Sequence, residues 1–153
     1  MDYEFETRQT EAQHVLTIHA TTTAHQLPEL LGELFGEVYG HIAGQGGQPS
    51  GMPFTRYYDM DGVNVDFECG MPVASPMVGT GRVRAGELPA CTVATVTHMG
   101  PYDNLPQSWN ALLSWMGSQG LEPAGPPWEV YVTDPGAEPD QSKWRTDIFF
   151  PVR

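Results

Sequence analysis

Val15-Leu16-Thr17-Ile18, followed nine residues on by Leu27-Pro28, decides the fold because both pieces recur 78 positions later in the chain. Val93-Ala94-Thr95-Val96 matches the first piece and Leu105-Pro106 matches the second, without a gap. The apolar positions that follow also coincide: Leu31, Leu34, Phe35 and Val38 fall on Trp109, Leu112, Leu113 and Met116. A period of this length indicates a duplicated domain half rather than a solenoid of short repeats.

Each half predicts the same order of elements: two strands, a helix and two more strands. Alternation over residues 3–7 and 14–20 predicts a first antiparallel pair of strands. Helical periodicity predicts helices over residues 27–42 and about 104–119, and Gly120 is expected to end the second. The other strands are expected near residues 53–59, 63–73, 81–84, 90–98, 128–133 and 144–151. The predicted class is α+β: duplicated βαββ units with pseudo-twofold symmetry, about eight antiparallel strands, two helices and a ligand groove between the halves.

Length and charge restrict the function. The 153 residues suit one domain, expected to span 1–153 with half-repeats at about 1–75 and 76–153. No apolar run is long enough for a membrane span and the acidic start is unlike a signal peptide, so we expect a cytoplasmic protein without membrane contact. The net charge of −12 repels a phosphate backbone, which argues against direct nucleic-acid binding and favours cationic ligands.

Several segments together match the pattern of a known family. They are His98-Met99-Gly100-Pro101-Tyr102, residues 120–127, Trp128-Glu129-Val130-Tyr131, residues 133–135, Trp144-Arg145-Thr146-Asp147-Ile148 and, in the first half, residues 65–68 and 71–73. In this combination the chain resembles the GyrI-like small-molecule-binding domain over nearly its whole length.

The resemblance implies the duplicated core, the ligand groove and a buried glutamate with stacked aromatic rings that receives cationic, lipophilic compounds. Family members include effector-binding portions of multidrug-sensing transcription regulators. They also include free-standing proteins, some of which inhibit DNA gyrase, while others hydrolyse the cyclopropane ring of DNA-alkylating natural products. Because the repeat begins near the N-terminus, we expect no helix-turn-helix and no one-chain transcription factor.

Glu129 is the main candidate for ligand recognition. The period of two along a strand places Glu129 and Tyr131 on one face, while Trp128, Val130 and Val132 point to the other. A carboxylate among apolar residues is hard to bury without a partner. Two interpretations follow: a structural acid satisfied by a tyrosine or backbone amide, or a counter-ion for a ligand cation whose flat body stacks on aromatic rings.

Further candidate positions extend the predicted site. Glu68 and Asp147 form a symmetric acidic pair in the closing strands, and Trp109 is interpreted as a core residue. The predicted ligand-binding residues are Glu129, Tyr131, Tyr102, Glu68, Phe67 and Tyr57. Phe67 and Tyr57 are more typical of a core, and an exposed strand face explains Glu68 almost as well. Glu129 and Tyr131 would be the catalytic residues of an enzyme. The histidines and cysteines lack ligand spacing, so neither a metal nor another cofactor is expected.

Three function classes remain open at this stage. The first is a protein that sequesters or senses amphipathic, often cationic or flat aromatic compounds. The second is a hydrolase that opens the cyclopropane ring of DNA-alkylating natural products, with Glu129 as general acid or base. The third is a gyrase-inhibitor-like module that binds a protein partner. Binding is preferred because the residues found suffice for it, whereas catalysis also requires a geometry that sequence does not reveal.

Overall fold

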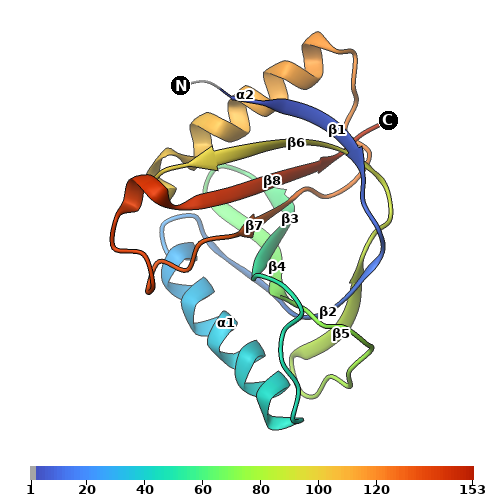
Figure 1. Cartoon of the computed structure of the whole chain (residues 1–153), viewed down its shortest axis with the longest axis vertical. Helices are drawn as coiled ribbons and strands as arrows, with labels where there is room; N and C mark the ends of the chain where they lie inside the picture. The colour runs from blue at the N-terminus through green and yellow to red at the C-terminus, as the bar shows by residue number, and fades with distance from the viewer. Residues whose placement is uncertain (1–2) are drawn as a thin grey trace. The chain divides into compact units, whose positions relative to one another are not determined.

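The structure of the chain, a computed structural model, describes residues 3–153. These residues form eight strands and two α-helices (Figure 1). In chain order they are β1 (Phe5–Gln9), β2 (Gln13–Thr23), α1 (Leu27–Gly44), β3 (Phe54–Met60), β4 (Asn64–Pro72), β5 (Val83–Leu88), β6 (Thr92–Met99), α2 (Leu105–Ser118), β7 (Trp128–Tyr131) and β8 (Arg145–Pro151). Short 3-10 helices at Tyr102–Asn104 (η1) and Gln141–Lys143 (η2) were not predicted. The α+β class is confirmed, and so are both helices.

The chain divides into two compact units. The first unit is Glu11–Ala90, and the second is Cys91–Arg153 together with the N-terminal segment that ends at Thr10. Strands of the first unit lie in the order β3-β4-β2-β5, and those of the second in the matching order β7-β8-β6-β1. Each of these neighbouring pairs within a unit is antiparallel.

Strand register shows that the duplication extends to individual residues. Ile18 of β2 pairs with Cys69 of β4, and the equivalent Val96 of β6 pairs with Ile148 of β8. In the same way Thr55 of β3 pairs with Cys69, while its counterpart Glu129 of β7 pairs with Ile148. The predicted internal duplication is therefore confirmed.

The predicted pairing of residues 3–7 with residues 14–20 is wrong. β1 pairs instead with β6, and β5 pairs with β2, so the leading strand of each half completes the sheet of the other repeat. The link between β1 and β2 is Thr10-Glu11-Ala12, and no non-glycine residue in the described range 3–153 has a positive φ angle. Tight two-residue hairpins need positive φ angles, so this link continues the chain from one unit into the other instead of reversing it.

Each helix packs its apolar stripe on the sheet of its own unit. Leu34, Val38 and Ile42 of α1 are fully buried against β2 and β4, and α2 packs on β6 (Figure 1). Both helices begin with Leu-Pro, where proline is tolerated because first-turn N–H groups need no helical partner. Gly120, with φ of +71°, ends α2 as predicted. Within the described residues, neither helix combines the length and apolar character required to cross a bilayer.

Candidate functional site

Glu129 lies on β7 of the second unit, where it pairs with Ile148 of β8. Ile148 is fully buried in the core that α2 covers, so Glu129 is on the helix-facing side of the sheet. Its exposed fraction is only 3 %. The strand therefore carries an acidic side chain into a position that is normally apolar.

Two neutral groups hold the carboxylate. The Trp109 indole Nε1–H of α2 donates to Oε2 of Glu129 at 3.0 Å, and the Tyr131 hydroxyl donates to Oε1 at 2.8 Å. Each oxygen thus accepts a hydrogen bond from a neutral donor, and these two bonds orient the carboxylate.

Aromatic rings continue outward from the carboxylate. The ring of Tyr102 in η1 meets Tyr131 edge to face at a centroid distance of 5.7 Å and lies 5.1 Å from the ring of Trp144. Trp144 is held by a 2.8 Å hydrogen bond from its indole N–H to the carbonyl of Glu138. We call Trp109, Tyr131, Tyr102 and Trp144 the aromatic cluster. It presents flat apolar surface next to a buried negative charge.

The electrostatics of the cluster are negative. Burial raises the pKa of Tyr102, and the carboxylates of Asp134 and Glu129 raise it further because they oppose a second negative charge. The negative potential of these carboxylates, which disfavours a tyrosinate at Tyr102, favours a cation at the same place. The Asp134 loop is exposed, as its proline and acidic residues predict.

The structure brings three of the six predicted ligand-binding residues together: Glu129, Tyr131 and Tyr102. The other three, Glu68, Phe67 and Tyr57, belong to the first unit. Phe67 is fully buried in that unit's core and Tyr57 packs against the same core. Their placement agrees with the core interpretation of both residues.

Glu68 takes part in a polar network on the other face of the first unit's sheet. Its carboxylate accepts hydrogen bonds from Thr17 at 3.2 Å and from Tyr58 at 2.7 Å, and Arg56 lies 3.7 Å away. Burial and the hydrogen bond to Glu68 raise the pKa of Tyr58 to about 12. Glu68 is thus held by side chains of its own unit.

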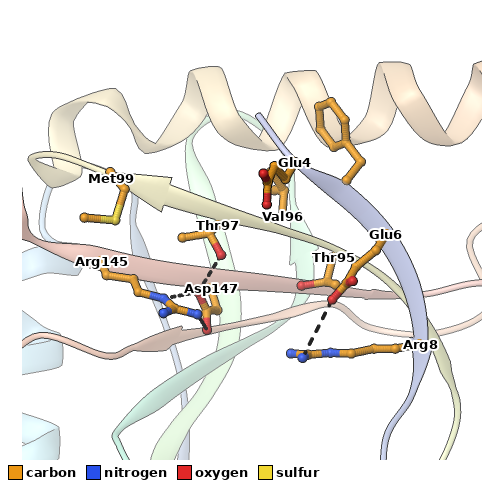
Figure 2. A pocket seen from close by; sticks show the side chains of 10 residues that line it. Glu4, Glu6, Arg8, Thr95, Val96, Thr97, Met99, Arg145 and Asp147 are labelled. Carbon is orange, nitrogen blue, oxygen red and sulfur yellow. Dashed lines mark hydrogen bonds and ion pairs between the residues drawn. The ribbon is translucent and has the colours of Figure 1, made fainter. Parts of the chain in front are cut away.

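Asp147 is the register counterpart of Glu68, as predicted, and it lines a pocket on the second unit's sheet (Figure 2). Because Asp147 neighbours the buried Ile148 along β8, this pocket lies on the opposite face of the sheet from Glu129. Two ion pairs lie among its lining residues: Arg145 with Asp147 at 2.9 Å and Arg8 with Glu6 at 3.9 Å (Figure 2).

Sequence reasoning missed two members of the aromatic cluster. Trp109 packs against the core as predicted, but its indole N–H also reaches Glu129, 20 positions along the chain. Trp144 follows η2 and directly precedes β8, and its ring meets Tyr102. Both contacts join separate elements, so no periodicity could reveal them.

A duplicated α+β core with a buried acid among aromatic rings defines a small-molecule-binding domain. The model of the GyrI-like small molecule binding domain matches residues 1–153, and the chain belongs to that family. A search of the curated proteins finds no match.

Solved structures share the fold. The C-terminal domain of EcmrR aligns with a TM-score of 0.84 at 24% identity, over 100% of this chain and 99% of that one. In the cryo-EM structure of EcmrR with DNA, the TM-score is 0.84 at 23% identity, and the alignment spans 99% of this chain but only 57% of that one. A hydrolase from Listeria innocua aligns with a TM-score of 0.69 at 15% identity, over 98% of this chain and 92% of that one. SAV2435 bound to tetraphenylphosphonium aligns with a TM-score of 0.66 at 15% identity, over 98% of this chain and 94% of that one.

Proposed function

We propose that the chain binds amphipathic cations with flat or bulky aromatic bodies at Glu129, and thereby sequesters or senses them. The observation that carries this proposal is the buried Glu129 carboxylate, 3 % exposed and surrounded by the aromatic cluster. The family description supports a small-molecule ligand.

The negative charge of Glu129 favours a ligand with a positive charge. Trp109 and Tyr131 orient the carboxylate through hydrogen bonds but carry no charge themselves. A buried carboxylate attracts a cation more strongly than one in water, and a lipophilic cation supplies the opposite charge while keeping water away. Aromatic faces such as that of Tyr102 stabilise the same cation through their quadrupoles.

The experiment is a calorimetric titration with methyltriphenylphosphonium and with the neutral triphenylphosphine oxide. A phosphonium probe is suitable because SAV2435, which shares the fold, was solved with tetraphenylphosphonium. Glu129→Gln should weaken binding of the cation by about 1.5–3 kcal/mol, in line with hydrogen bonds to charged groups. Binding of the neutral compound should be nearly unaffected.

Asp147→Asn is the matched control, since it makes the same chemical change on the opposite face of the same sheet. It should bind both compounds like the wild type. Equal losses for cation and neutral compound in Glu129→Gln would mean that Glu129 only supports the fold, and the proposal would be wrong.

A hydrolase is the second candidate. The supporting observation is the 2.8 Å contact between the Tyr131 hydroxyl and Glu129, which pairs an acid-base group with a hydroxyl donor. In that reaction Glu129 would take a proton from water as the water oxygen bonds to a cyclopropane carbon. The ring C–C bond would break, and its electron pair would move into the conjugated carbonyl of the alkylator.

Incubation with a cyclopropane-bearing alkylator distinguishes the two candidates. Product in molar excess over protein, abolished by Glu129→Gln with the fold and ligand affinity retained, would establish the hydrolase. Stoichiometric protection of the alkylator without product supports sequestration.

A further inference from the structure

Thr146 occupies the middle of a row of three side chains across the second unit's sheet. It pairs with His98 of β6 on one side and with Tyr131 of β7 on the other. Paired residues point to the same face, so Thr146 shares the helix-facing side with Tyr131 and Glu129. β6, β8 and β7 lie side by side in this order (Figure 1).

The Thr146 hydroxyl is buried away from the polar groups that residues 3–153 could offer it as hydrogen-bond partners. The residue is fully buried, and its Oγ1 meets no donor or acceptor among residues 3–153. Buried hydroxyls in proteins nearly always have a partner, because losing water without a replacement costs free energy. The hydroxyl therefore requires an explanation, and valine would fill the same space without that cost.

The neighbours of Thr146 direct their polar groups elsewhere. Both ring nitrogens of His98 are engaged, Nδ1 with Ser108 and Nε2 with the carbonyl of Pro101. The Tyr131 hydroxyl donates to Glu129. The position of Thr146 next to the Glu129 site thus leaves a ligand as a natural partner.

We propose that Thr146 is a hydrogen-bonding position of the ligand site, so that preferred cations carry an amino or hydroxyl group in addition to their charge. This inference rests on the proposed function of Glu129. The two residues are diagonal neighbours on adjacent strands, a separation of roughly 7–8 Å. One drug-sized aromatic cation spans that distance.

Two fluorescent or calorimetric probes test the proposal: ethidium, an aromatic cation with ring amino groups, and tetraphenylphosphonium, which has no hydrogen-bonding group. Thr146→Val should lower the affinity for ethidium by about tenfold, the size of one net hydrogen bond. The affinity for tetraphenylphosphonium should change by less than about twofold. Thr146→Ser, which keeps the hydroxyl, should retain ethidium affinity. The melting temperature of Thr146→Val should equal or exceed that of the wild type.

Thr95→Val is the matched control, because Thr95 is also buried in this sheet but lines the pocket on the opposite face. It should bind both probes normally. Equal losses of affinity for the two probes in Thr146→Val, or undiminished ethidium binding, would overturn the proposal. An ordered water would then be the hydrogen-bond partner of the hydroxyl. A wild type that binds neither probe would instead contradict the proposed function itself.

Discussion

His98 and Ser108 form a buried hydrogen bond of 2.6 Å between the imidazole Nδ1 and the serine Oγ, and this bond ties β6 to α2. The other ring nitrogen, Nε2, lies 3.0 Å from the carbonyl oxygen of Pro101, which only accepts, so Nε2 carries a hydrogen. The Ser108 hydroxyl that bonds Nδ1 also donates to the Tyr3 hydroxyl at 3.3 Å. Since Pro101 directly precedes Tyr102, the imidazole also holds the turn that places Tyr102 in the aromatic cluster.

Ser108→Ala should destabilise the protein by about 1–3 kcal/mol, because it removes the hydrogen-bond partner of a buried imidazole nitrogen. Urea denaturation measures the change. Ser118→Ala is the control: that serine is exposed, donates to the carbonyl of Trp115 in its own helix and accepts a 3.4 Å contact from the side chain of the neighbouring Gln119. Equal stability of the two variants would contradict the role assigned to the His98 bond.

Trp109→Phe should lower the free energy of unfolding by about 1.5–3 kcal/mol, because the ring remains while the hydrogen bond to a charged acceptor is lost. In a Glu129→Gln background the same substitution should cost less, since the acceptor is then neutral. A double-mutant cycle by urea denaturation measures this coupling. Additive effects would show that the indole N–H and the carboxylate do not stabilise each other.

Stability should depend on pH through Tyr58, whose pKa burial and Glu68 raise to about 12. The folded protein holds the phenol proton more tightly than the unfolded chain, where the pKa is about 10. The contribution is therefore complete below pH of about 10 and is lost as the pH rises toward 12. Wild type should lose more stability over this window than Tyr58→Phe, as measured by denaturation at each pH. Parallel curves of stability against pH for the two proteins would refute the raised pKa of Tyr58.

Gly70→Ala should destabilise the protein by about 1–3 kcal/mol, because the added Cβ collides with the backbone carbonyl of Leu16 on the neighbouring strand. Backbone atoms of a paired strand cannot move aside. Gly36→Ala on α1 is the opposite case: no heavy atom lies within 4 Å of its added Cβ, and alanine should stabilise the helix by up to about 1 kcal/mol. Thermal unfolding distinguishes the two, and loss of stability in both would contradict the difference in packing.

The candidate site could be predicted in part. Glu129 and Tyr131 share a face by the period of a strand, and the structure joins them at 2.8 Å. The Trp109 indole could not be assigned to Glu129, because its place on the helix stripe is already explained by the core. The same limit applies to Thr146: that its hydroxyl has no hydrogen-bond partner within the described range 3–153 becomes visible only when its neighbours across β8 are known.

Sequence by itself determined the duplication, the helix that begins at each Leu-Pro, and the face on which Glu129 lies. All three depend on local periodicity, which the backbone imposes on any helix or strand. Tertiary structure alone decided that β1 joins β6 rather than β2, that the Trp109 indole reaches Glu129, that Trp144 meets Tyr102 and that His98 bonds Ser108. Those contacts join separate elements, and their distances follow from how helix and sheet pack, which no spacing along the chain encodes.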